Sequence, residues 1–143
     1  MNMIAAEEKK SIGARAGDYF GNGCHCAEAV TKAVLEEMGE DPSQALACAT
    51  AFGGGFGKSF EEACGALSGA LIAIGQLHGR QKYGGEWEIA ADLGAQIRQQ
   101  FVNDFGTTHC ASLRDRFGEE HQMDECRKVV ERVTTSLLEI LTE

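Results

Sequence analysis

The sequence predicts an all-α fold: a compact single-domain bundle of about six helices spanning residues 1–143. Apolar residues recur at spacings of three and four, which is the helical period. Runs of β-branched residues are few, and the chain contains a single proline, Pro42. A chain of 143 residues can bury roughly two-thirds of its unfolded surface as one domain. Loops between the apolar segments are short, so most consecutive helices should lie nearly antiparallel.

Turn residues and apolar spacing divide the chain into helical segments, two of them short. The expected ranges are about 5–20, 24–38, 44–52, 60–78, 86–105, 109–117 and 122–141. Asn22 is expected to cap the second segment, and Ser59 with Glu62 forms an S-x-x-E capping box that opens the fourth. The third segment carries Cys48 among small apolar residues, which predicts a buried thiol. Trp87, at the start of the fifth, is expected to anchor the core.

The last segment has a strict heptad stripe of apolar residues over less than three heptads. At this length such a stripe is more typical of a bundle core than of a dimer seam. The sequence therefore leaves open whether the protein forms a homodimer.

Charge and hydropathy exclude several classes of partner. The net charge of −9 argues against nucleic acid and against an anionic membrane surface, since both attract basic patches. The longest apolar run, residues 70–74, is far shorter than the ~20 residues of a membrane helix. Two glutamates precede two lysines at residues 7–10, which is unlike a secretory signal. We therefore expect a cytoplasmic protein with no membrane and no nucleic-acid partner.

Six cysteines are the main chemical signal of the sequence. Cytosolic thiols are kept reduced, so cysteine patterns there mark metal or redox chemistry more often than disulfides. Four of the six fall in the first or second turn of an expected helix: Cys26, Cys64, Cys110 and Cys126. Free amides and the helix dipole favour a thiolate at such positions. Their spacings match neither C-x-x-C zinc sites nor ferredoxins, so a shared site has to be assembled by folding.

The helix dipole alone does not ionise these thiols. Its typical contribution of ~0.3–1 kcal/mol lowers a thiol pKa by well under one unit from about 8.5. A second influence is required, such as a neighbouring histidine (His25 or His109), several backbone amides or a metal ion. The four thiols are expected to converge on one locality centred on Cys64, with Cys24 and Cys48 outside it.

A glycine-rich stretch, FGGGFG at residues 52–57, precedes Cys64. Such a loop before a helix can hold an anion on backbone amides, which makes Gly54, Gly55 and Gly57 candidate cofactor-binding positions. The stretch lacks the correctly spaced K-[ST] ending of a P-loop, and it follows a helix rather than a strand. Its more typical role is to bend the chain so that Cys64 approaches the other helix starts.

These motifs resemble the C-GCAxxG-C-C family, small proteins described as redox-active. The family's G-x-N-C-A-x-A-V is similar to residues 23–30, with His25 where asparagine is usual, and its glycine run and C-G-A-x-x-G element resemble residues 52–57 and 64–69. Its F-G-x-x-x-C-x-x-L resembles residues 105–113, and its last cysteine resembles Cys126. The likeness covers about residues 21–126. It implies a redox or metal role for the same four cysteines, and no substrate.

Two functional hypotheses from different classes stay open. In the first, the four cysteines are redox thiols that react with a redox partner protein or a small thiol or oxidant. In a metal-binding form of that hypothesis, the same four residues hold an iron–sulfur cluster or a zinc ion. In the second, the chain is a non-catalytic binding or structural module with packing cysteines and an anion-holding glycine loop. The sequence does not decide whether the protein is an enzyme.

Overall fold

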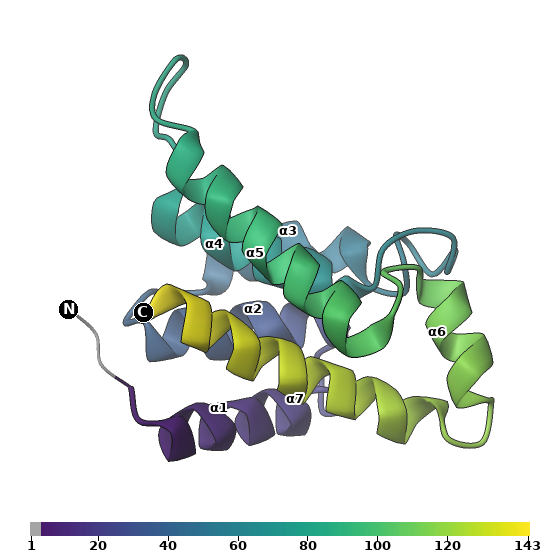
Figure 1. Ribbon diagram of the computed structural model, residues 1–143. Helices are drawn as coiled ribbons and strands as arrows, with labels where there is room; N and C mark the ends of the chain where they lie inside the picture. The colour runs from purple at the N-terminus through teal and green to yellow at the C-terminus, as the bar shows by residue number, and fades with distance from the viewer. Residues whose placement is uncertain (1–3) are drawn as a thin grey trace.

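The computed structural model describes residues 4–143 (Figure 1). They form seven α-helices and one 3-10 turn, joined by loops. Their bounds are α1 Ala6–Tyr19, α2 Cys26–Glu37, α3 Ser43–Ala49, η1 Thr50–Phe52, α4 Gly65–His78, α5 Glu88–Phe105, α6 Cys110–Phe117 and α7 Gln122–Leu141. Within these residues there is no β-strand, which confirms the all-α prediction. No helix in this part of the chain has the length and apolar character needed to span a membrane.

The helices share one apolar core. The most extensive contacts join α1 to α7 and α2 to α4, while α5 lies against both α4 and α7. The heptad stripe of α7 is buried at Val130, Val133 and Leu137, so it faces the bundle interior as expected. In Figure 1, α6 stands across the end of the bundle at which α7 begins. That end carries the cysteines described below.

Helices α2 and α4 approach each other very closely. A Cβ on Gly69 of α4 would overlap the carbonyl oxygen of Ala27 in α2. The hydroxyl of Thr31, buried between the two helices, lies 2.9 Å from the carbonyl oxygens of both residues. The small residues of α4 therefore let α2 pack closely against it.

The start of α4 differs from the prediction. The helix begins at Gly65, not near residue 60, and the capping box with Ser59 does not form. The Ser59 hydroxyl instead donates to the carbonyl of Gly55. Residues 53–64 stay a loop because the carbonyls of Phe60 and Glu62 accept hydrogen bonds from the first amides of α6.

Three side-chain predictions in other parts of the fold are wrong. Asn22 does not cap α2, because its amide donates to the carbonyl of Asp18. Cys48 is exposed, since the residues that α3 buries are Ala45 and Ala49. Trp87 is also exposed, at the loop before α5, and so does not anchor the core.

Candidate functional site

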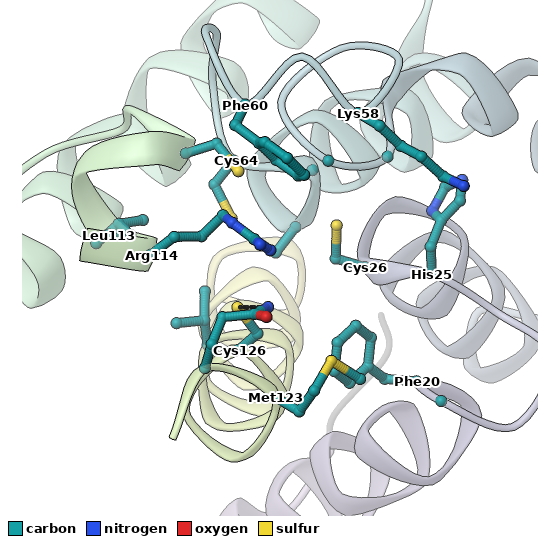
Figure 2. Close-up of a pocket in the computed structure, with 18 of the residues that line it drawn as sticks. Phe20, His25, Cys26, Lys58, Phe60, Cys64, Leu113, Arg114, Met123 and Cys126 are labelled. Carbon is teal, nitrogen blue, oxygen red and sulfur yellow. Dashed lines mark hydrogen bonds between the residues drawn. The ribbon is translucent and has the colours of Figure 1, made fainter. Parts of the chain in front are cut away.

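Side chains of the four helix-start cysteines line one cavity of about 570 Å³ (Figure 2). Cys26 comes from α2, Cys64 from the residue that caps α4, Cys110 from α6 and Cys126 from α7. All four are half-buried free thiols. The fold thus brings together the four residues on which the sequence placed the site.

Two details of the expected arrangement are wrong. Cys64 lies directly before its helix and not one turn inside it. Cys24 also lines the cavity, although it was expected to lie outside. Its environment is nonetheless distinct, because the charges that act on its thiol are those of Glu28, Lys32 and Glu36. Cys48 is not part of the cavity wall.

A short antiparallel bridge sets Cys64 next to the start of α6. Ala63 pairs with His109, the Cys64 amide donates to the carbonyl of Thr108 at 2.7 Å, and the Cys110 amide donates to that of Glu62 at 2.9 Å. Residues on either side of a bridged pair point to the face opposite that pair. Cys64 and Cys110 therefore share one face of this bridge. The sequence did not predict this bridge, because a single bridged pair requires no segment of alternating apolar and polar residues.

Glycines leave the space into which the thiols fit. A Cβ on Gly55 would lie 2.6 Å from the Cβ of Cys110, and a Cβ on Gly65 would overlap the sulfur of Cys26. Of the three candidate cofactor-binding glycines, Gly54 and Gly57 line the cavity, whereas Gly55 makes room for Cys110. Binding of a cofactor by these glycines stays a prediction.

The loop that contains these glycines is left-handed over several residues. Backbone φ is positive at every residue of the segment 54–58, including Phe56 (69°) and Lys58 (61°). A non-glycine residue in this conformation costs about 1–2 kcal/mol. Hydrogen bonds from the Gly57 amide to Ala51 (2.8 Å) and from the Phe60 amide to Gly54 (2.9 Å) hold it in place. Strain of this kind persists only where the surroundings enforce it, and it is common at functional sites.

His25 has a structural and an electrostatic role. It is the N-cap of α2, where its Nδ1 accepts from the Glu28 amide and the Glu28 carboxylate accepts from the His25 amide. Its Nε2 lies 2.9 Å from the carbonyl oxygen of Thr50. The pKa of His25 is raised, chiefly by its interaction with the neighbouring Cys26 thiol. Gly53 allows this placement, since a Cβ there would lie 2.6 Å from the imidazole ring.

Cys26 is the thiol best prepared to ionise. Burial by itself would raise its pKa, but the interaction with His25 and the N–H groups of Gly54 and Ala27 outweigh burial, so the pKa lies below its ordinary value. Two backbone amides and an imidazole thus supply the second influence that the helix dipole needs. Cys26, rather than Cys64, is the electrostatic centre of the group.

The other three thiols stay protonated at neutral pH. Burial and the negative charge of Cys26 raise the pKa of Cys64. The same two causes raise the pKa of Cys110 to about 11, against the opposing charge of Arg114. Burial also raises the pKa of Cys126, although the amide of Gln122 donates to its sulfur at 3.3 Å. Burial likewise raises the pKa of Cys24, so the cavity holds one activated thiol among four neutral ones.

Arg114 is a site residue that the sequence reasoning missed. Its guanidinium lies 4.0 Å from the ring centroid of Phe60, and it lines the cavity. Its charge acts on the thiols of Cys110 and Cys126. The spacing of Cys110 and Arg114, four residues apart at the start of one helix, was the signal that placed them on the same face. His109, the other candidate partner of a thiol, instead pairs through Nδ1 with Ser112 at 2.7 Å.

The described residues do not form a ready-made metal site. Among residues 4–143, no three side chains of His, Cys, Asp or Glu lie close enough together to hold an ion. A tetrahedral zinc site needs four ligands that share one centre, with sulfur at ~2.3 Å. Metal binding by the four cysteines therefore stays a hypothesis that requires their rearrangement.

Comparison with family models returns one whose description reads "Putative redox-active protein (C_GCAxxG_C_C)", and it matches residues 24–140. Comparisons with curated proteins and with solved structures returned no match. The matched segment includes all four helix-start cysteines, the glycine-rich loop and Arg114. Because the match extends over most of the chain, this protein belongs to the C_GCAxxG_C_C family, which is described as redox-active.

Proposed function

We propose that this protein carries out thiol–disulfide exchange, with Cys26 as the nucleophile and Cys64 as the resolving thiol. The observation that carries the proposal is the presence of one thiol of lowered pKa among four thiols of raised pKa in a single cavity. The thiolate is the reactive form of cysteine, and a neighbouring thiol is needed to release a mixed disulfide. The redox description of the family supports the same class of reaction.

In the first step, the Cys26 thiolate attacks one sulfur of a disulfide R–S–S–R. A bond forms between Cys26 and one S–R group, and the S–S bond of the oxidant breaks. The other half leaves as a thiolate with the bonding electron pair. The amides of Gly54 and Ala27 stabilise the negative charge on Cys26 and thereby fix the position of the attacking sulfur.

In the second step, the Cys64 thiol gives its proton to the departing thiolate and attacks the sulfur of Cys26. The second R–SH leaves, and a Cys26–Cys64 disulfide remains, so two cysteines are oxidised and one disulfide is reduced to two thiols. Cys64 is the chosen partner because the residue after it, Gly65, faces the Cys26 sulfur directly. Formation of the mixed disulfide also removes the Cys26 charge, which is one cause of the raised Cys64 pKa.

Cys110 and Cys126 are the remaining redox thiols of this proposal. Cys110 shares a face of the Ala63–His109 bridge with Cys64. Attack by Cys110 on the Cys64 sulfur would exchange one internal disulfide for another, with no net oxidation. Cys110 would thus extend the exchange inside the cavity, and Cys126, on the same cavity wall, is the fourth candidate redox thiol.

Trapping of intermediates tests the order of these steps. Reduced protein is mixed anaerobically with one equivalent of a small disulfide, quenched with acid, and mapped by peptide mass spectrometry. The first adduct is expected on Cys26, followed by a Cys26–Cys64 disulfide. Cys26→Ser should abolish the rapid phase, whereas Cys48→Ser, which removes an exposed thiol outside the cavity, should leave it unchanged. Rapid reaction of the Cys26→Ser variant would refute the proposal.

His25→Asn tests the cause of the activation. Asparagine can still cap a helix but lacks the imidazole that interacts with the Cys26 thiol, so the pKa of Cys26 should rise and its alkylation at neutral pH should slow. The pH dependence of the iodoacetamide rate measures this shift. His78→Asn, at the other end of α4, serves as the control. An unchanged profile in His25→Asn would assign the activation to the backbone amides alone.

The metal hypothesis uses the same four cysteines and has its own test. The protein is purified anaerobically, its metal content is measured, and its absorption spectrum is recorded. Stoichiometric zinc, or iron with the colour of a cluster, would replace thiol exchange as the proposed chemistry. Metal-free protein with the trapped intermediates described above would support thiol exchange.

A further inference from the structure

Acidic side chains do not line the cavity, although the chain is strongly acidic. The sequence has 22 Asp and Glu residues against 13 Lys and Arg. None of the described residues that line the cavity is Asp or Glu, whereas His25, Lys58 and Arg114 all do so. Figure 2 shows Arg114 across the cavity from His25 and Lys58. A negatively charged molecule would thus meet positive groups from two sides.

Arg114 is held in place without a carboxylate partner. It lies over the ring of Phe60, half-buried, and takes part in none of the ion pairs formed by the described residues. Lys58 likewise has no carboxylate partner within that part of the chain. Because no carboxylate of the described residues neutralises Arg114 or Lys58, both leave their charge at the cavity available to a ligand.

The rest of the wall is apolar and the space is small. Besides the thiols, its main side chains are Phe20, Phe60, Leu113, Phe117, Met123 and Val129. A volume of about 570 Å³ falls within the roughly 300–1,000 Å³ range of small-molecule sites. The reactive thiols lie half-buried inside this hollow and not on a projecting surface. These features suit a small molecule better than a folded protein.

From the charge, the apolar wall and the volume together, we infer that the oxidant of Cys26 is a small organic disulfide that carries a negative charge beside an apolar group. This inference rests on the proposed function and names its substrate class. The anionic group pairs with Arg114, and the apolar group lies against Phe60 and the neighbouring side chains. Atoms and electrons balance as in the two-step exchange of R–S–S–R with Cys26 and Cys64. R is the part of the disulfide that carries the negative charge and the apolar group.

A charge series of disulfides tests the inference on the reduced full-length protein. The probes are 5,5′-dithiobis(2-nitrobenzoate), which is anionic, 4,4′-dithiodipyridine, which is neutral, and cystamine, which is cationic. Each rate constant for Cys26 is divided by that of 2-mercaptoethanol with the same probe, which removes differences in leaving group. We expect the normalised rate for the anionic probe to exceed that for the cationic probe about tenfold at low salt. High salt should remove the preference.

Arg114 variants identify the group responsible. Arg114→Gln should lower the normalised rate for the anionic probe about tenfold and leave that for the neutral probe unchanged. Arg114→Lys keeps the charge without the planar stacking and should keep most of the preference. Arg98→Gln removes the same charge from an exposed position on α5 outside the cavity, and it should have no effect.

Two results would overturn the inference while leaving the proposed function intact. One is equal normalised rates for the three probes, or an equal loss with all three in Arg114→Gln. The other is faster oxidation of Cys26 by oxidised thioredoxin than by every small probe, which would indicate a protein partner. If no disulfide reacts at Cys26, the proposed function itself fails.

Discussion

The two loops that flank α4 are both rich in glycine, yet they differ in their hydrogen bonding and in their packing on the bundle. Residues 53–64, before the helix, are tied by backbone hydrogen bonds to α6 and to one another, and they pack on the thiols. Residues 79–87, after it, project from the bundle and expose Tyr83 and Trp87 (Figure 1). A Cβ on Gly84 would meet nothing within 4 Å, whereas one on Gly55 would overlap its neighbours. Glycine content therefore does not identify a functional loop, whereas the packing of Gly55 against Cys110 does distinguish this one.

Alanine substitution in each loop tests this difference most strongly. Gly55→Ala combines an unfavourable φ of 60° with a contact 2.6 Å from the Cβ of Cys110, so the free energy of unfolding should fall by about 3 kcal/mol or more. Gly84→Ala has only the unfavourable φ of 69° and should cost about 1 kcal/mol. Urea unfolding followed by circular dichroism measures both. Equal losses would show that packing on the thiols does not distinguish the loops.

Alkaline pH tests the contribution of the cavity thiols to the free energy of unfolding without any substitution. Above the ordinary thiol pKa of 9.0, unfolded cysteines lose their protons while folded Cys110 keeps its proton up to about 11 and Cys64 beyond that. The unfolded state then binds fewer protons, so the free energy of unfolding should fall as pH rises above 9.0. Cys26 has the opposite sign, because its lowered pKa adds stability that is lost as pH falls through the folded value. Urea midpoints measured above pH 9.0 give the alkaline slope and those measured below it give the slope of Cys26, and the Cys64→Ala variant should show a weaker alkaline loss.

Two glycines within α4 sharpen the comparison on a single helix. Gly75 has open space at its Cβ position, so Gly75→Ala should stabilise the protein by about 0.5–1 kcal/mol through helix propensity alone. Gly65→Ala gains the same propensity but displaces the sulfur of Cys26, which offsets the gain. The displaced thiol moves away from the Gly54 amide, so its pKa should rise and its alkylation at neutral pH should slow. Iodoacetamide kinetics that match in the two variants would contradict this.

Cys48→Ala should have the smallest effect. The residue is exposed on α3 and lies outside the cavity, so the change in the free energy of unfolding should stay within about 0.5 kcal/mol. Peptide mapping after treatment with a disulfide should show the same adducts as in the unaltered protein. Altered chemistry in this variant would mean that the cavity is not the only reactive locality.

Local signals in the sequence were enough to place most helices and the helix starts at Cys26 and Cys110. Apolar spacing placed the long helices, and glycine or capping residues next to Cys26 and Cys110 placed those thiols at helix starts. Both kinds of signal depend on residues only a few positions apart, so they can be recognised without knowledge of the tertiary structure.

The features that the sequence did not predict depend on partners that are distant in the chain or on few local constraints. The sequence around Ser59 matches the local pattern of a capping box. The loop does not become helical there because its carbonyls accept hydrogen bonds from the first amides of α6, about fifty residues later in the chain. His25 is not a usual N-cap residue, so its pairing with Glu28 was not anticipated. Helix α3 has only seven residues, too few for apolar spacing to decide which face Cys48 occupies.

The left-handed run at residues 54–58 also bears on how the chain meets proteases. Proteases bind their substrates as extended segments. The peptide bond after an exposed lysine or arginine is therefore cleaved only where the backbone can become extended. Lys58 is exposed but lies in a hydrogen-bonded, left-handed loop, whereas Arg80 and Lys82 are exposed in the projecting loop. Limited trypsin digestion should therefore cut the native protein after residue 80 or 82 first. Cleavage after Lys58 then becomes a direct signal that the wall of the thiol cavity has opened.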